Sequence, residues 1–139
     1  SKQLCVVVAD TILETTDGNV LHKPKDFSDA YDMVHYVSSK SMVVLTGIGV
    51  RLLTFTNERW QIVHEQCSVT STLVNFHVPE NEIENYFKKN PTALKACGAT
   101  VIEGHAARYL KEIQGSYTGI LGLPLDVLQT MLIQCGWWT

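Results

Sequence analysis

The sequence predicts a single α/β domain over residues 1–139, with a mixed central sheet flanked by helices. Two observations support this fold class. Segments rich in β-branched residues alternate with segments whose apolar residues recur at helical spacing. No linker, repeat or low-complexity stretch divides the chain, and 45% hydrophobic with 18% charged residues is typical of a globular domain. A chain of 139 residues is long enough to bury a core without disulfides.

The N-terminal part of the chain is expected to form one strand followed by one helix. A run of β-branched residues at 4–9 indicates a buried strand, which delivers Asp10 at its C-terminal end. After a turn, a helix is expected to begin near Asp26 or Ser28, because either side chain can cap it. Its apolar face comprises Ala30, Met33, Val34 and Val37.

The middle of the chain is expected to form antiparallel strands. Residues 42–55 are rich in strand-forming residues, with an interruption expected at residues 47–49, where two glycines stand. A turn at 56–59 leads to a returning strand at 60–66, and a further strand is expected at 68–76. The connections between these strands are short, which favours antiparallel neighbours.

The remaining residues are expected to form two helices and one strand. Pro79 suits the first position of a helix over 79–89, whose early glutamates and late lysines match the helix dipole. Loops and turns are expected at 92–104, a strand at 108–113 and a final helix at 124–135. The inward positions of the final helix are Leu125, Leu128, Met131 and Leu132.

Composition and charge exclude several classes of protein. A net charge of −3 argues against a protein that binds the nucleic-acid backbone. No apolar run approaches the length needed to span a bilayer, so a membrane partner is not expected either. Four cysteines and five histidines show no zinc-type spacing. We therefore expect buried free thiols and a cytoplasmic location.

Asp10 and Lys23 are the first candidates for chemistry. A carboxylate just past a strand, followed thirteen residues later by a lysine, suits metal-assisted phosphate chemistry. Asp10 can hold Mg²⁺ or activate a water molecule, and Lys23 can neutralise a phosphate oxygen. A second interpretation stays open at this point, in which Asp10 caps a turn and Lys23 is a solvated surface residue.

Six short motifs follow one another along the chain. They are Ala9-Asp10-Thr11-Ile12-Leu13, Leu21-His22-Lys23-Pro24, Leu45-Thr46-Gly47-Ile48, Thr72-Leu73-Val74-Asn75-Phe76, Glu82-Ile83-Glu84-Asn85-Tyr86, and Gly115-Ser116-Tyr117 with Gly122-Leu123-Pro124-Leu125. In this order, over residues 5–133, they resemble the Maf family of septum-formation-associated proteins. Members of that family are nucleoside triphosphate pyrophosphatases, so the resemblance implies a Maf/ITPase-like fold and this activity.

The resemblance assigns roles to three residues. It implies that Asp10 is the catalytic carboxylate and a ligand of Mg²⁺ or another divalent cation, and that Lys23 contacts the phosphates of a nucleoside triphosphate substrate. Thr11 either supports Asp10 and the substrate through its hydroxyl or is a β-branched strand residue, and both interpretations stay open. The products implied are a nucleoside monophosphate and pyrophosphate.

Residues 95–104 bear on the choice of base. In the larger Maf branch this region contains Asp-Lys-Ala-Gly and ends in Gln-Gly, and its members favour dTTP and UTP. A second branch ends in Glu-Gly and prefers 7-methyl-GTP, and Glu103-Gly104 resembles that branch. A carboxylate at Glu103 can accept from the N1–H and N2–H₂ donors of guanine. The alternative is that Glu103 is an exposed turn residue.

One part of the family pattern is absent. Complete Maf proteins begin with a Ser-x-Ser-Pro-Arg-Arg-like loop that cradles the triphosphate, so the expected fold lacks its N-terminal portion. Either the chain is part of a longer enzyme, which an unpaired apolar strand at 4–9 favours, or it is a shortened relative. In the second case a non-catalytic nucleotide-binding or assembly module is the alternative function. Family members are commonly dimeric, so a homodimer is also expected.

Overall fold

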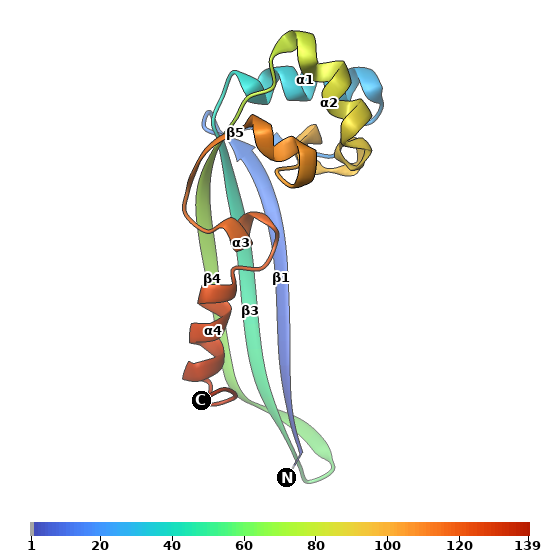
Figure 1. The fold of residues 1–139 in the computed structure, drawn as a ribbon. Coiled ribbons are helices and arrows are strands. Elements are labelled where there is room, and N and C mark those ends of the chain that lie inside the picture. Colours follow the sequence, from blue (N-terminus) through green and yellow to red (C-terminus); the bar gives the residue numbers. More distant parts are fainter. Residues whose placement is uncertain (1) are drawn as a thin grey trace. The chain divides into compact units, whose positions relative to one another are not determined.

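The computed structural model describes residues 2–139, and it confirms the expected α/β architecture (Figure 1). One five-stranded sheet has the order β2-β1-β3-β4-β5. The strands are β1 (Gln3–Thr15), β2 (Val20–Leu21), β3 (Met42–Thr56), β4 (Arg59–Phe76) and β5 (Leu110–Gln114). A mixed sheet was expected, but the sheet is antiparallel. Leu13 of β1 lies opposite Leu21 of the antiparallel strand β2, and β4 and β5 are also antiparallel.

Helices and 3₁₀ turns occupy the segments between and after the strands. They are α1 (Phe27–Ser38), η1 (Glu80–Glu82), α2 (Ile83–Lys89), η2 (Pro91–Lys95), η3 (Cys97–Ala99), η4 (Gly104–Tyr109), α3 (Tyr117–Ile120) and α4 (Leu125–Gln134). The helix expected over 79–89 therefore opens with a 3₁₀ turn, and the strand expected at 108–113 begins two residues later. Within the described residues, no helix has the length and apolarity needed to cross a membrane.

The expected interruption of the strand at 47–49 is wrong, because β3 continues through both glycines. Neither Gly47 nor Gly49 has a positive φ, so both fit an extended strand. A Cβ atom at Gly49 would lie 3.2 Å from Cγ2 of Val8 on the neighbouring strand. The glycine at this position thus permits a close approach of β1 and does not mark a break.

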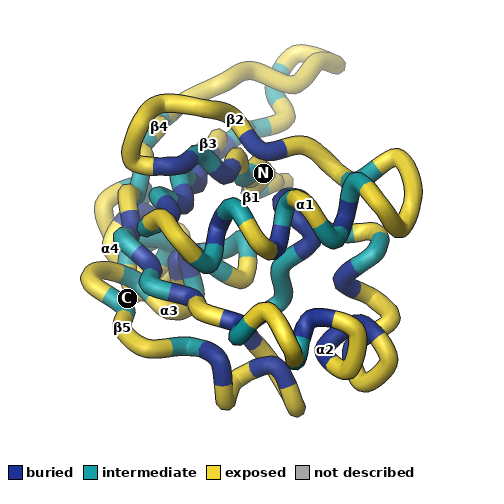
Figure 2. The backbone as a smooth tube through the Cα atoms, turned by 90° about the horizontal axis from the view of Figure 1, so that it is seen from above, coloured by how far each residue is buried: buried dark blue, intermediate teal, exposed yellow. Residues whose placement is uncertain are grey.

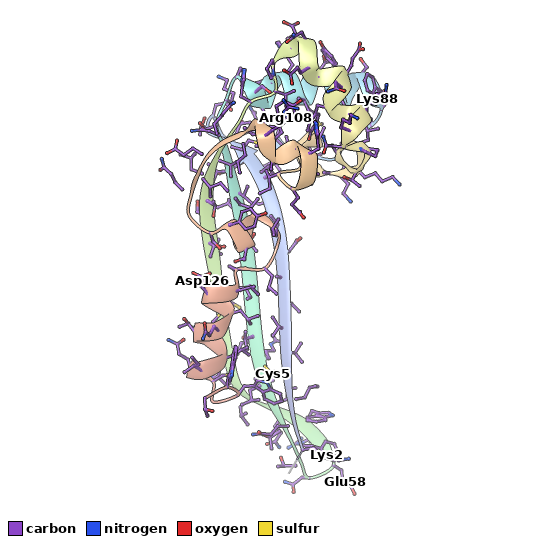
Figure 3. The ribbon with its side chains drawn as sticks, viewed as in Figure 1. Lys2, Cys5, Glu58, Lys88, Arg108 and Asp126 are labelled. Atoms are coloured by element: carbon purple, nitrogen blue, oxygen red, sulfur yellow. The ribbon has the colours of Figure 1, made fainter. Side chains whose placement is uncertain are left out.

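The two strands expected at 60–66 and 68–76 are a single strand, β4. Cys67, the residue between the two expected strands, is neither glycine nor proline, so it does not interrupt the hydrogen bonds between strands. The expected turn before β4 is confirmed: Asn57 and Glu58 have φ values of 49° and 61°, the pattern of a tight hairpin turn. Glu58 lies at the tip of this hairpin (Figure 3).

The chain forms two compact units, each with its own packing. The first comprises the residues up to Thr11 together with Leu45–Ser71 and Ser116–Thr139. In this unit α4 lies along β3 and β4 (Figure 1), and Met131 packs against Ile48 and Val50. Leu125 was expected to face inward but is 54% exposed, because it is the first residue of the helix.

The second unit comprises Ile12–Val44 and Thr72–Gly115. Asp26 caps α1 as expected, since its side chain accepts a hydrogen bond of 2.8 Å from the Asp29 N–H. Ala30, Val34 and Val37 form the buried side of α1, and Figure 2 shows buried parts of the chain in dark blue. Four aromatic rings pack edge to face in the core of this unit: Phe76, Tyr86, Phe87 and Tyr109.

The four cysteines carry free thiols, as expected, but none of them is fully buried. Cys67 is exposed and the other three are half-buried. Gln66 bonds to Gln134 on α4, so the next residue, Cys67, points to the opposite face of β4. Its exposure follows from the alternation of side chains along a strand.

Candidate functional site

Asp10 lies within β1 in the first unit, and its side chain is exposed. The expectation of a buried strand at 4–9 that ends at Asp10 is wrong, because β1 continues to Thr15 and, apart from Cys5, residues 4–9 are exposed. One carboxylate oxygen, Oδ1, accepts a hydrogen bond of 2.9 Å from the backbone N–H of Thr11. Within residues 2–139, no other hydrogen bond or ion pair engages this carboxylate. The second oxygen is therefore free to meet a cation or a water molecule.

The hydroxyl of Thr11 takes part in a different contact. It lies 2.8 Å from the hydroxyl of Thr46, and Thr46 in turn donates its proton to the carbonyl oxygen of Gly119 at 2.7 Å. A hydroxyl has one proton, so Thr46 must accept from Thr11. Thr11 thus reaches Asp10 through its backbone N–H, while its hydroxyl joins β1 to β3. A role of Thr11 in substrate binding stays a prediction.

Sequence reasoning missed Thr46 and Gly119 as supporting residues. Thr46 is completely buried on β3, and Gly119 is a buried residue of α3 whose N–H bonds to the hydroxyl of Ser116 at 2.9 Å. A Cβ atom at Gly119 would lie 3.2 Å from the Thr70 hydroxyl oxygen, so only glycine fits without a shift. The one signal in the sequence was the Thr-Gly pair within an apolar strand.

Lys23 lies in the second unit, two residues after β2, and its side chain is exposed. The preceding residue, His22, accepts a hydrogen bond of 2.9 Å at its carbonyl oxygen from the N–H of Gly98. Gly98 has a φ of +65°, and a Cβ atom there would lie 3.0 Å from Leu13 and 3.1 Å from Leu21. The structure therefore brings the Lys23 segment next to the loop that leads to Glu103.

Glu103 also lies in the second unit, directly before η4, and is exposed. Its carbonyl oxygen accepts from the Ala106 N–H at 3.2 Å, which begins the turn. Within residues 2–139, its carboxylate makes no hydrogen bond or ion pair. A charged acceptor is thus available to a ligand at this position. Asp10 and Thr11 belong to the first unit, and Lys23 and Glu103 to the second.

The donor set fits one mode of metal binding. Among the described residues, no three His, Cys, Asp or Glu side chains converge on a point, so the protein alone offers no complete cage. Mg²⁺ is commonly held by one or two carboxylates, water molecules and the phosphates of the substrate. The single free oxygen of Asp10 fits that mode, in which the nucleotide supplies the remaining ligands.

Comparison with known proteins gives the family context. The family model described as Maf-like protein matches residues 1–135. A dTTP/UTP pyrophosphatase of Ruminiclostridium cellulolyticum is 38% identical over 128 residues, which are 91% of this chain and 62% of that protein. Its namesake from Thermotoga maritima is 32% identical over 138 residues, 99% of this chain and 62% of that protein. The chain spans less than two thirds of the length of these relatives.

Proposed function

The chain belongs to the family of Maf-like proteins, and from that premise we propose that the protein hydrolyses nucleoside triphosphates to nucleoside monophosphates and pyrophosphate. The observation that carries this proposal is the family match over residues 1–135, together with a free carboxylate oxygen at Asp10 within its motif. The relatives named dTTP/UTP pyrophosphatases support the same reaction class.

Hydrolysis between the α and β phosphates makes three demands. A cation must spread the charge, a basic group must hold the polyphosphate, and a carboxylate must orient or deprotonate the attacking water. Asp10 serves as that carboxylate in the proposal, with one oxygen fixed by the Thr11 N–H and the other directed to the water or cation. Lys23 neutralises a phosphate oxygen. Asp10 and the substrate phosphates would hold Mg²⁺ or another divalent cation, which would supply the charge stabilisation.

Glu103 is proposed to select the base. A carboxylate can accept from both N1–H and N2–H₂ of a guanine edge, and N7-methylation makes that ring cationic, which adds a charge attraction. The proposed substrate is therefore a modified purine triphosphate such as 7-methyl-GTP. A second candidate is dTTP or UTP, which the names of the relatives favour.

The decisive experiment measures pyrophosphate release from a panel of nucleotides by the full-length protein, with Mg²⁺ and with a chelator. Asp10→Asn should lower kcat by about 10²- to 10⁴-fold, the usual contribution of a positioned base. The control is Asp126→Asn on α4 (Figure 3), an exposed carboxylate in the first turn of that helix, which should retain full activity.

Two results would count against the proposal. Equal activity of the wild type and Asp10→Asn would remove Asp10 from the mechanism. If no nucleotide in the panel yields pyrophosphate, the proposal that the protein is an enzyme is wrong. In that second case, calorimetry with a non-hydrolysable nucleotide tests the alternative of a non-catalytic binding module, which should bind without turnover.

A further inference from the structure

The hydroxyl of Tyr86 bridges two backbone groups of the loop that leads to Glu103. Tyr86 lies on α2 and is completely buried. Its oxygen donates to the carbonyl of Ala99 at 3.0 Å and accepts from the N–H of Val101 at 3.1 Å. Both contacts are within four residues of Glu103. A single side chain thus fixes the backbone on both sides of Thr100.

The loop needs such a constraint because its backbone conformation is unfavourable. Gly98 and Ala99 have φ values of +65° and +51°, so two successive residues occupy the left-handed region. Glycine tolerates this region, but alanine rarely adopts it without support from its surroundings. Ala99 is completely buried, and its carbonyl oxygen is the one that Tyr86 engages.

The position of the Tyr86 hydroxyl is itself fixed by packing. The ring lies edge to face against Phe87, Tyr109 and Phe76, with centroid distances of 5.1, 5.7 and 5.8 Å. Burial raises the pKa of Tyr86 to about 12, so the hydroxyl keeps its proton at neutral pH and can donate to Ala99. The protonated hydroxyl can therefore make both contacts of the bridge at neutral pH.

We infer that Tyr86 is a positioning residue for base selection: by holding residues 99–101 it presents the Glu103 carboxylate to the base of the nucleotide. The carboxylate has no partner of its own within residues 2–139, so its placement depends on the backbone on either side. Tyr86 holds the preceding side, and the Ala106 N–H holds the following side. This inference rests on the proposed function.

The first test examines the loop without any nucleotide. Tyr86→Phe removes the bridge and keeps the ring, and Tyr109→Phe is the matched control. Tyr109 is buried in the same cluster, but its hydroxyl donates to Glu82 at 2.8 Å, outside the loop. Hydrogen exchange at the Val101 amide should become at least tenfold faster in Tyr86→Phe and stay unchanged in Tyr109→Phe. Unchanged exchange in Tyr86→Phe would overturn the inference.

The second test measures kcat/KM for 7-methyl-GTP and for UTP. Tyr86→Phe should change the ratio of the two values by about three- to tenfold, mainly through KM, whereas Tyr109→Phe should keep the ratio. If exchange rises and the ratio stays constant while Glu103→Gln alters it, the positioning role is wrong and the proposed function stands. If the wild type hydrolyses no nucleotide, the proposed function fails, and the positioning role fails with it.

A further variant covers the case in which Tyr86→Phe does not fold. Ala99→Gly removes the cost of a left-handed alanine, so it should offset part of the destabilisation and allow the double variant Tyr86→Phe/Ala99→Gly to fold. Exchange at the Val101 amide should be faster in the double variant than in Ala99→Gly alone, and the substrate ratio should differ between the two, because only the double variant lacks the Tyr86 hydroxyl. Equal exchange and an equal ratio in these two proteins would overturn the inference.

Discussion

Thr46 donates its hydroxyl proton to the carbonyl oxygen of Gly119 at 2.7 Å, across 73 positions of the sequence. This bond joins β3 to α3. The same hydroxyl oxygen accepts from Thr11, so the residue next to Asp10 belongs to the same network. The strand that carries the candidate catalytic carboxylate is thus tied to its neighbours through two hydroxyl groups.

Thr46→Val should destabilise the protein by about 1–3 kcal/mol. Valine has nearly the same shape, but it leaves the Gly119 carbonyl and the Thr11 hydroxyl without their partner, and buried polar groups lose about that much when they become unpaired. Thr46→Ser keeps the hydroxyl and is the control. Urea unfolding of both variants measures the difference. Wild-type stability of Thr46→Val would show that the network contributes nothing to folding.

Local sequence patterns predicted which helices and strands form better than they predicted where each strand begins and ends. The capped start and the buried face of α1 follow from spacing alone, because both depend on residues within one helix. The continuity of β3 through Gly49 does not, because it depends on the close approach of Val8 from another strand. In the same way, the partner of the Thr46 hydroxyl cannot be found locally, since threonine is common in strands for its shape.

The candidate site could be predicted in part. The order of motifs made Asp10 and Lys23 candidates, and the resemblance of residues 95–104 to one family branch made Glu103 a candidate; all three side chains are exposed in the structure. Neither identified Tyr86 as a residue that holds the loop before Glu103. A tyrosine on the apolar side of a helix is predicted as core, and only the fold shows that its hydroxyl reaches two backbone groups of that loop.

Gly98→Ala should destabilise the protein more than Gly18→Ala. Both glycines have a positive φ, of +65° and +87°, so each substitution carries the cost of a left-handed alanine, about 1 kcal/mol. At Gly18 the new methyl group would meet nothing within 4 Å, whereas at Gly98 it would lie 3.0 Å from Leu13. Overpacking there should add about 1–3 kcal/mol. Thermal unfolding measures both, and equal losses would contradict the predicted clash.

Stability should fall between pH 10 and pH 12 because of Tyr86. Burial raises the pKa of Tyr86 from 10.0 to about 12 in the folded protein. In this range the unfolded chain loses the tyrosine proton before the folded one does, so rising pH favours unfolding. Below pH 10 the protonated Tyr86 makes its full contribution to the free energy of unfolding. By pH 12 the difference between the two pKa values removes about 3 kcal/mol of that free energy.

The measurement compares the wild type with Tyr86→Phe by urea unfolding from pH 9 to pH 12. Charge changes elsewhere in the chain are common to both proteins and largely cancel in the comparison. The wild type should lose more stability than the variant across this range, because the variant lacks the titrating group. Parallel pH profiles would show that Tyr86 is not protected from ionisation.

The protein should self-associate through the edge of β1. Within the described residues, β2 pairs with β1 only at Leu13 and Glu14, which leaves the preceding edge of β1 without a partner strand. Unpaired strand edges favour pairing with another chain. Light scattering should show a dimer in the micromolar range, and Val8→Lys, at a side chain that is 63% exposed, should reduce it. Ile133→Lys on α4 is the control, and a monomeric wild type would contradict the prediction.

Glu103→Gln should change the choice of substrate more than the rate of the chemical step. The substitution removes the charge and replaces one acceptor by donors, so the guanine donors lose a partner and a cationic ring loses its attraction. A mismatch of this kind is worth about 1–3 kcal/mol, or roughly ten- to a hundredfold in the ratio of kcat/KM for 7-methyl-GTP over UTP. Glu84→Gln on α2, another exposed glutamate of the same unit, should keep the wild-type ratio. If Glu103→Gln keeps it as well, Glu103 is a turn residue, and the preference of this protein would then be expected to follow that of relatives named for dTTP and UTP.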